Sequence, residues 1–223
     1  MKSVLITGAT SGLGKKLSET LVKNFQVFCL GRNKKELAYL EKIGCKTLCI
    51  DFLLEEKNWI KKINDFCNNT DILINNAGIF PIKNITNSSI KDYENCFKIN
   101  VKTPYLLMKN YIPGMVRKKS GYVINILSSS AYNGSKDTGL YCASKHALLG
   151  LTRSAFLEYR EKGVKVCSVS PGSLQTPMGK KDIRQDFDTF IEVSEIVSYI
   201  EFLLSTGSSA AINEIKINRM VVK

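Results

Sequence analysis

The sequence predicts an α/β fold in which one doubly wound parallel sheet carries helices on both of its faces. Short apolar runs rich in Val, Ile, Leu and Cys recur along the chain. They lack the polar alternation of a half-exposed strand, as strands that are buried on both faces require. Longer amphipathic stretches separate these runs, and such strand–helix alternation is typical of a parallel sheet.

The expected elements alternate along the whole chain. The apolar runs predict strands at Ser3–Thr7, Gln26–Leu30, Lys46–Ile50, Asp71–Asn75, Gly121–Leu127, Val164–Val169 and Asn213–Ile217. The amphipathic stretches predict helices at Leu13–Asn24, Lys34–Ile43, Glu55–Phe66, Asn100–Lys119, Tyr141–Lys162 and Val193–Leu204. No internal repeat, low-complexity linker or break in composition divides these elements, so residues 1–223 are expected to form a single domain.

Composition limits the classes of function. The net charge is +12, but the lysines are spread along the chain, which favours a solvated surface over nucleic-acid binding. A basic rim that attracts an anionic cofactor or an acidic carrier protein remains an alternative. No apolar run could span a bilayer, no signal segment follows Met1, and the seven cysteines form no C-x-x-C pair. These features predict a cytoplasmic protein with reduced thiols, without a metal site and without a membrane partner.

The first expected strand runs into a glycine-rich stretch, TGATSGLG, which precedes the first expected helix. Gly8, Gly12 and Gly14 allow the backbone to turn sharply and to come close to a pyrophosphate. The helix that follows would present its free N–H groups and its positive dipole end to that charge. The alternative is a glycine-rich turn that binds no ligand.

The second expected strand ends in LGRN, where NAD-binding folds usually place an acidic residue against the ribose 2′-hydroxyl. Gly31 occupies this position and Arg32 follows it, which favours NADP over NAD because a guanidinium attracts the 2′-phosphate. A solvated residue at a helix start is the alternative for Arg32. Asp51 closes the third strand, where its carboxylate could accept a hydrogen bond from adenine. Asn75–Gly78 close the fourth strand, where small residues allow close approach to the ribose.

Tyr141 and Lys145 are four residues apart, which places them on one face of the same expected helix. A nearby ammonium would lower the pKa of the phenol and prepare it for proton transfer. A reacting carbonyl needs a second hydrogen-bond donor, and Ser128 lies thirteen positions before Tyr141. The pairs Tyr105/Lys109 and Tyr132/Lys136 have the same spacing, but neither has a hydroxyl residue at that offset.

Taken together, these motifs resemble the short-chain dehydrogenase/reductase family across nearly the whole chain. The resemblance rests on T-G-x-x-x-G-x-G, Asp51, N-N-A-G, Asn100 in KINV, Ser128, Y-x-x-x-K and P-G-x-x-x-T. It implies a Rossmann-type domain that binds a dinucleotide and carries the catalytic residues. It also implies a homodimer or homotetramer in which the helices that carry Asn100 and Tyr141 pack against a second subunit.

The resemblance also implies roles for individual residues. Tyr141 would act as acid and base, Ser128 would polarise the substrate oxygen, and Asn100 would hold a water in a proton relay. Lys145 would bind the nicotinamide ribose and tune the phenol. The residues expected to contact the cofactor are Gly8, Thr10, Ser11, Gly12, Leu13, Gly14, Arg32, Asp51, Phe52, Asn76, Ala77, Gly78, Tyr141, Lys145, Pro171, Gly172 and Thr176.

The chain departs from the family pattern at three places. Ser11 stands where NADP-preferring members often carry a basic residue, so the NADP prediction rests on Gly31 and Arg32. The segment between Thr176 and the last expected helix is brief, which predicts a reduced substrate lid. The stretch INRMVVK replaces the usual V-D-G-G, so the choice between dimer and tetramer stays open.

The expected activity is NADP(H)-dependent hydride transfer between the nicotinamide and a carbonyl or secondary alcohol. Among specific substrates, a 3-oxoacyl thioester is the first expectation, because 3-oxoacyl-carrier-protein reductases share these motifs and a basic surface suits an acidic carrier. The alternatives are reduction of a sugar, a polyol or another small ketone, and a non-catalytic NADP-binding regulator. The single histidine, His146, is interpreted as an ordinary helix residue, which leaves no base for a Ser-His-Asp hydrolase.

Overall fold

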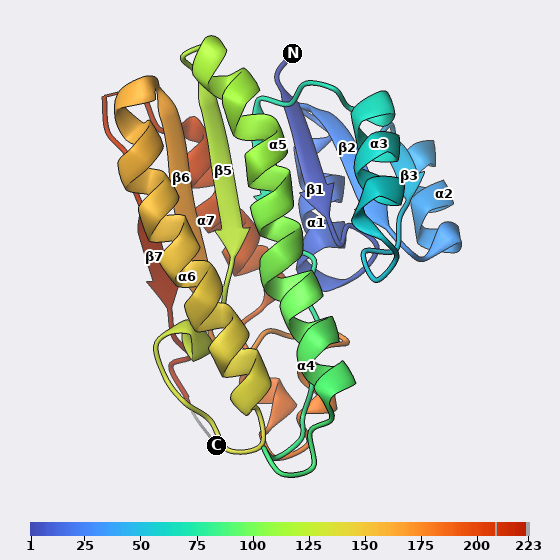
Figure 1. The fold of residues 1–223 in the computed structure, drawn as a ribbon, viewed down its shortest axis with the longest axis vertical. Helices are drawn as coiled ribbons and strands as arrows, with labels where there is room; N and C mark the ends of the chain where they lie inside the picture. The colour runs from blue at the N-terminus through green and yellow to red at the C-terminus, as the bar shows by residue number, and fades with distance from the viewer. Residues whose placement is uncertain (208, 222–223) are drawn as a thin grey trace.

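The computed structural model describes residues 1–207 and 209–221, and its centre is a seven-stranded sheet in which every strand pair is parallel. The spatial order is β3-β2-β1-β4-β5-β6-β7 (Figure 1). The strands are β1 (Ser3–Thr7), β2 (Gln26–Gly31), β3 (Lys46–Cys49), β4 (Ile72–Asn75), β5 (Gly121–Ile126), β6 (Val164–Pro171) and β7 (Glu214–Ile217). The predicted doubly wound α/β fold is confirmed.

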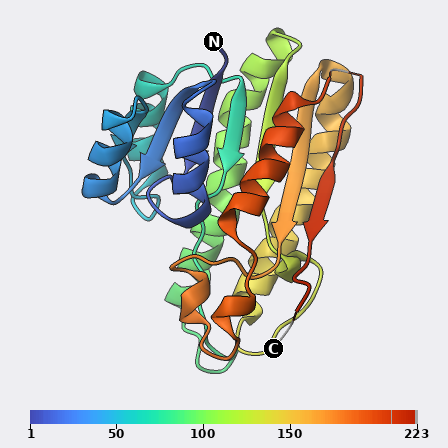
Figure 2. The same cartoon turned by 180° about the vertical axis from the view of Figure 1, so that it is seen from behind.

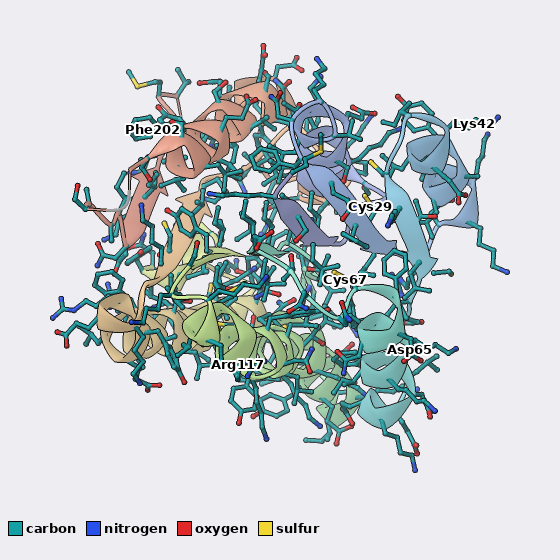
Figure 3. All side chains as sticks on the ribbon, turned by 90° about the horizontal axis from the view of Figure 1, so that it is seen from above. Cys29, Lys42, Asp65, Cys67, Arg117 and Phe202 are labelled. Atoms are coloured by element: carbon teal, nitrogen blue, oxygen red, sulfur yellow. The ribbon has the colours of Figure 1, made fainter. Side chains whose placement is uncertain are left out.

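Helices cover both faces of the sheet, as the view from behind and the view from above show (Figures 2 and 3). The helices α1 (Gly12–Leu21), α2 (Lys34–Lys42) and α7 (Val193–Ser205) contribute to one apolar core, which includes Leu17, Leu40 and Ile200. The helices α3 (Glu56–Phe66), α5 (Thr103–Arg117) and α6 (Gly139–Tyr159) contribute to the core on the opposite face. The strands are therefore buried on both sides, which explains their unbroken apolar runs.

The order of the strands reverses between β1 and β4, which are neighbours in the sheet although two strands separate them in the chain. From β1 the chain winds outward to β3, and from β4 it winds the other way to β7. The loops that follow β1 and β4 therefore diverge to opposite faces and leave a crevice at the carboxyl edge of the sheet. This is the place where ligands bind in open α/β sheets.

The helix predicted at Asn100–Lys119 differs most from the structure. An additional helix, α4 (Ile90–Phe97), and a π-helical turn at Lys98–Lys102 precede α5, which begins only at Thr103. Ser89 caps α4 in a capping box with Asp92: the Ser89 hydroxyl accepts a hydrogen bond from the Asp92 N–H at 3.1 Å. The wider turn places Asn100 inward with no exposed surface.

The other helices begin and end within a few residues of their predicted bounds. The helix that carries Tyr141 begins earlier, at Gly139, and ends at Tyr159, where a 3₁₀ turn (Arg160–Lys162) continues it. Further 3₁₀ turns lie at Ser129–Ala131, Gly179–Lys181 and Phe187–Thr189. The last two belong to the brief segment before α7.

Gly163 provides a test of the turn that leads into β6. Its φ is +77°, and a Cβ atom there would collide with the carbonyl oxygen of Lys119. The change Gly163→Ala should therefore lower the free energy of unfolding by about 1–3 kcal/mol in urea titrations.

The matched control is Gly150→Ala. Gly150 lies in α6 with open space around the position of a Cβ atom. Alanine should raise stability there by up to about 1 kcal/mol, because it is the better helix former. Equal stability of the two variants would contradict this account of the turn.

Candidate active site

A cleft of about 640 Å³ lies at the carboxyl edge of the sheet. It is formed by the segments that follow all seven strands and by the beginning of α6. Of the predicted site residues, Gly14 and Asn100 do not line it. Those that do are Gly8, Thr10, Ser11, Gly12, Leu13, Arg32, Asp51, Phe52, Asn76, Ala77, Gly78, Ser128, Tyr141, Lys145, Pro171, Gly172 and Thr176.

The glycine-rich loop turns the chain from β1 into α1. Gly8 and Gly12 have φ values of +66° and +49°, which disfavour residues with side chains. Ser11 precedes α1 without capping it, and no acidic residue lies in the first turn. The helix therefore offers uncapped N–H groups and its positive end to the cleft, as a phosphate site requires.

Gly14 faces the protein interior in the structure, and its contact with a cofactor stays a prediction. A Cβ atom at Gly14 would overlap the carbonyl oxygen of Gly8 and the side-chain amide of Asn76. Gly14 thus allows α1 to pack closely against the loops after β1 and β4.

Hydrogen bonds join these two loops where the strand order reverses. The Thr7 hydroxyl accepts from the backbone N–H groups of Asn76, at 3.0 Å, and Ala77, at 2.9 Å. In return, the Asn76 side-chain amide donates to the Thr7 carbonyl at 2.9 Å and to the Gly8 carbonyl at 3.2 Å. The floor of the crevice is therefore held by side chains from both halves of the sheet.

At the end of β2, Gly31 has a second role that the sequence did not reveal. A Cβ atom there would collide with the side chain of Thr10, which fills the space above it. Arg32 is largely exposed and lies 3.8 Å from the Asp51 carboxylate, so its guanidinium is only loosely paired. Asp51 in turn accepts a hydrogen bond from the Leu53 N–H at 2.9 Å.

Tyr141 and Lys145 both reach the cleft from α6, and Ser128 reaches it from the end of β5. The Lys145 ammonium donates to the Ile126 carbonyl at 2.9 Å and lies 5.6 Å from the centre of the Tyr141 ring. Phe80 packs edge-on against that ring at 4.7 Å. The structure thus brings the predicted hydroxyl, phenol and amine together on one side of the cleft.

The pKa values of this group differ from the expectation that Lys145 lowers the pKa of Tyr141. Burial raises the pKa of Tyr141 to about 12, and the Ser128 hydroxyl opposes that shift only in part. Burial also lowers the pKa of Lys145 to about 8. Both shifts favour the uncharged forms, because the low-dielectric cleft penalises a phenolate and an ammonium alike.

Asn100 braces the wall of the cleft instead of lining it. Its side-chain oxygen accepts from the Ile79 N–H at 2.9 Å, and its amide donates to the Ile79 carbonyl at 3.0 Å. The same amide donates to the Ser144 hydroxyl at 3.0 Å. Because Ile79 and Phe80 line the cleft beside Tyr141, the amide of Asn100 fixes the position of that wall.

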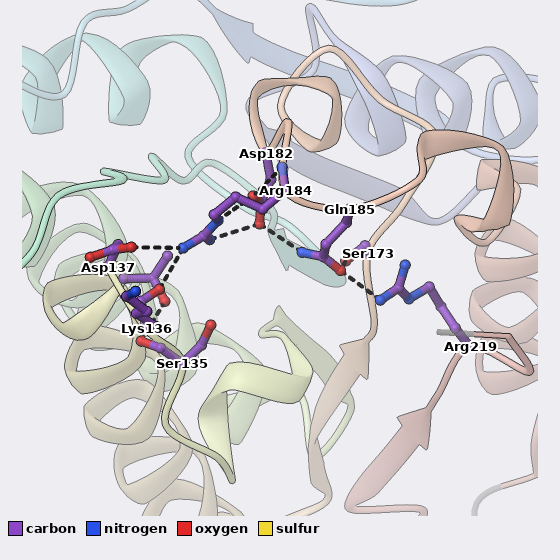
Figure 4. A network of polar contacts seen from close by, with 9 residues as sticks. Ser135, Lys136, Asp137, Ser173, Asp182, Arg184, Gln185 and Arg219 are labelled. Carbon is purple, nitrogen blue, oxygen red and sulfur yellow. Dashed lines mark hydrogen bonds and ion pairs between the residues drawn. The ribbon is translucent and has the colours of Figure 1, made fainter. Parts of the chain in front are cut away.

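The segment after Thr176 supplies a polar wall that the motifs did not predict (Figure 4). Asp182 is buried, and Arg184 donates to both of its oxygens, at 2.6 and 2.9 Å. Arg184 therefore lowers the pKa of the Asp182 carboxyl. It also donates to the Lys136 carbonyl at 2.7 Å, which ties this segment to the loop before α6.

The residues rejected as catalytic candidates lie apart from this chemistry. Tyr105 is exposed on α5, and the Tyr132 hydroxyl donates to Glu214 at 2.8 Å. His146 is exposed on α6 and bonds through Nδ1 to the Cys142 carbonyl at 2.9 Å.

Within residues 1–207 and 209–221 no group of His, Cys, Asp and Glu side chains could hold a metal. No helix in that part of the chain has the length and apolar character to cross a membrane.

The buried amine gives a test with a defined pH window. The pKa of Lys145 is about 8 in the folded protein, against 10.5 for an ordinary lysine. Between these values the unfolded chain binds more protons, so the contribution of Lys145 to stability rises with pH. Below pH 8 the penalty for the buried ammonium is fully present. In cofactor-free protein at pH 7, Lys145→Met should raise the unfolding free energy by about 1–3 kcal/mol.

That advantage should shrink as the pH approaches 10, which urea titrations at several pH values would measure. Lys109→Met, at an exposed position on α5, is the control and should change stability by the same small amount at every pH. A constant difference between Lys145→Met and the wild type would contradict the assignment.

Comparison with known proteins identifies relatives of the whole fold and of its motifs. The family described as short chain dehydrogenase matches residues 2–186. The 3-oxoacyl-(acyl-carrier-protein) reductase FabG of Buchnera aphidicola subsp. Schizaphis graminum is 35% identical over 190 residues, which cover 80% of this chain and 76% of the relative.

Two solved structures superimpose over nearly the full length. A 4-hydroxyisoleucine dehydrogenase complexed with NADH has a TM-score of 0.89 and 28% identity, with 98% of each chain covered. ElxO with NADP bound has a TM-score of 0.84 and 25% identity, with 97% of each chain covered.

Proposed function

This chain belongs to the short chain dehydrogenase family of oxidoreductases, and we propose that it transfers a hydride between NADP(H) and a carbonyl or secondary alcohol. One observation carries the proposal: a single cleft holds a phosphate-binding glycine loop and a Ser128/Tyr141/Lys145 group. A dinucleotide that spans the cleft would bring its nicotinamide to the phenol. The glycine loop alone would suit a regulator, but a regulator needs no buried phenol and amine.

The residues of the cleft fit the cofactor. The uncapped N-terminus of α1 and the loop from Gly8 to Gly12 would hold the pyrophosphate, where a Cβ atom at either glycine would be strained. Arg32 would pair with a 2′-phosphate, and Asp51 would accept from adenine. When bound, the cofactor supplies or accepts the hydride. The neighbour with NADP bound supports NADP(H) as the cofactor. The other neighbour is complexed with NADH, so proteins of this fold differ in the cofactor that they bind.

Tyr141 would transfer the proton. With a pKa of about 12 its phenol stays protonated at neutral pH, and a phenol is the group that must donate when a carbonyl is reduced. Ser128 would hold the carbonyl oxygen by a second hydrogen bond. Lys145 and the residues Pro171, Gly172 and Thr176 would position the nicotinamide ribose and ring.

Asn100 is proposed as a positioning residue rather than as a direct water ligand. Its side-chain amide is already bonded to Ile79 and Ser144. In this role it holds the wall against which Tyr141 packs.

A 3-oxoacyl thioester is the first substrate to test, because relatives of 31–35% identity carry the name of 3-oxoacyl-(acyl-carrier-protein) reductases. Small ketones and sugars are the alternatives in the same assay. A homo-oligomer remains part of the proposal, and Tyr105 on α5 and Leu157 on α6 are among the exposed apolar side chains that could take part in it.

Loss of the phenol hydroxyl tests the proton transfer. Tyr141→Phe should lower turnover by about 10²–10⁴-fold, since general acid–base catalysis contributes that much. The affinity for NADPH, measured by fluorescence titration, should change little. Tyr105→Phe removes a hydroxyl from an exposed position and should leave turnover intact. Near-normal turnover of Tyr141→Phe would refute the assignment.

The choice of cofactor is tested at Arg32. Arg32→Gln should weaken NADPH binding by about tenfold or more, because a charge-assisted hydrogen bond contributes roughly 1.5–3 kcal/mol. Binding of NADH, which lacks the 2′-phosphate, should be nearly unchanged in the same titration. Lys42→Gln, at the exposed end of α2, removes the same charge away from the cleft and should alter neither affinity. Equal affinity of the wild type for both cofactors would overturn the NADP proposal.

A further inference from the structure

Arg219 follows β7, in the stretch INRMVVK where the chain departs from its family, and it lines the same cleft as Tyr141. It lies next to Gly172: a Cβ atom added there would be 3.4 Å from Cγ of Arg219. Its guanidinium stacks on the buried ring of Phe190 at 5.0 Å. The side chain is half-buried and fixed, unlike a solvated surface arginine.

The polar partners of Arg219 are all neutral. One terminal nitrogen donates to the Thr189 hydroxyl at 3.2 Å, and the other donates to the Gln185 side-chain oxygen at 2.5 Å. Among the described residues, 1–207 and 209–221, no carboxylate oxygen lies within 4.0 Å of its guanidinium. Within residues 1–207 and 209–221, therefore, no carboxylate pairs with the positive charge that Arg219 brings to the cleft.

Gln185 keeps the two arginines of this wall apart (Figure 4). Its amide nitrogen donates to Asp182 at 2.6 Å, so its oxygen must face Arg219. Asp182 is the carboxylate that neutralises Arg184. A glutamate at position 185 would place a carboxylate beside Arg219 and neutralise it, and it would also lose the N–H group that donates to Asp182. The amide thus orients Arg219 while leaving its charge available.

We propose that Arg219 binds a carboxylate of the substrate, so that the enzyme acts on short oxo acids and the corresponding hydroxy acids. A guanidinium matches a carboxylate by two parallel hydrogen bonds, and it is far more effective in a cleft than on the surface. Gly172 is expected to lie on the nicotinamide side, so the carboxylate would be bound at the end of the cleft where the reacting carbonyl is proposed to lie. This inference rests on the proposed oxidoreductase function and names the substrate class of the same site.

Turnover of matched substrate pairs is the first test. The set comprises short 2-, 3- and 4-oxo acids, their methyl esters, acetoacetyl-coenzyme A and the neutral acetoacetyl thioester of N-acetylcysteamine. Wild type should prefer the acids to the esters in kcat/KM. Arg219→Gln should raise KM for the acids by about 10- to 100-fold and leave the values for the esters nearly unchanged.

Other results would overturn the proposal. The proposal would be rejected if the wild type turned over the methyl esters with the same kcat/KM as the acids. An effect of Arg219→Gln on acetoacetyl-coenzyme A alone would mean that the anion is a phosphate of the acyl carrier. A matching loss of NADPH affinity, measured without substrate, would mean that Arg219 serves the cofactor.

A binding test gives an answer without turnover. Malonate, succinate and glutarate are titrated calorimetrically into protein saturated with NADP⁺. At least one should bind to the wild type, and Arg219→Gln should weaken that binding by about tenfold or more. Gln185→Glu should weaken it similarly, because the new carboxylate pairs with Arg219. Arg117→Gln is the control and should bind normally, because Arg117 is exposed at the end of α5, just before the amino end of β5 and away from the carboxyl edge of the sheet.

The two proposals fail differently. Absence of saturable binding by all three dicarboxylates, with neutral ketones still reduced through Tyr141, would reject the carboxylate site and keep the oxidoreductase. Normal dicarboxylate binding without NADPH oxidation by any carbonyl would reject the proposed reaction and keep Arg219 as an anion site.

Discussion

The hydrogen bonds between the loops after β1 and β4 are the constraint on which the cleft depends. The strands β1 and β4 are paired in the sheet, but the loops that follow them diverge and have no regular strand pairing between them. The Thr7 hydroxyl and the Asn76 amide close the gap from opposite sides, at 2.9–3.2 Å. Gly14 allows α1 to settle onto this junction. The position of the glycine loop at the edge of the cleft therefore follows from a few partly buried polar contacts.

Local sequence predicted those parts of the molecule whose cause is local. The strands could be located because burial on both faces imposes an unbroken apolar run, as in β1 and β5. The sequence suggested one helix from Asn100 onward, whereas the structure has α4 and a π-helical turn before α5 begins at Thr103. The capping pair Ser89 and Asp92 was present as a signal for α4. The π-helical turn had none, because it depends on the contact of Asn100 with Ile79, which is 21 residues away.

The same distinction holds for the candidate site. Tyr141, Lys145 and the glycine loop could be recognised because spacing along one helix or one turn defines them. The pKa values of the phenol and the amine could not, since they depend on how completely the fold removes water from both groups. The wall formed by Asp182, Gln185 and Arg219 was also missed. Its members come from two segments that only the pairing of β6 and β7 brings together.

The packing of Thr10 over Gly31 constrains how the coenzyme preference of this chain could evolve. An acidic side chain at position 31 would suit a free ribose hydroxyl, but its Cβ atom has no room while threonine remains at position 10. Replacement of Thr10 by a smaller residue would have to come first. The two positions are therefore epistatic, since neighbouring substitutions that share one space do not act additively. In a lineage that carries this threonine, an acidic residue at that position requires the side chain of residue 10 to move or to be replaced.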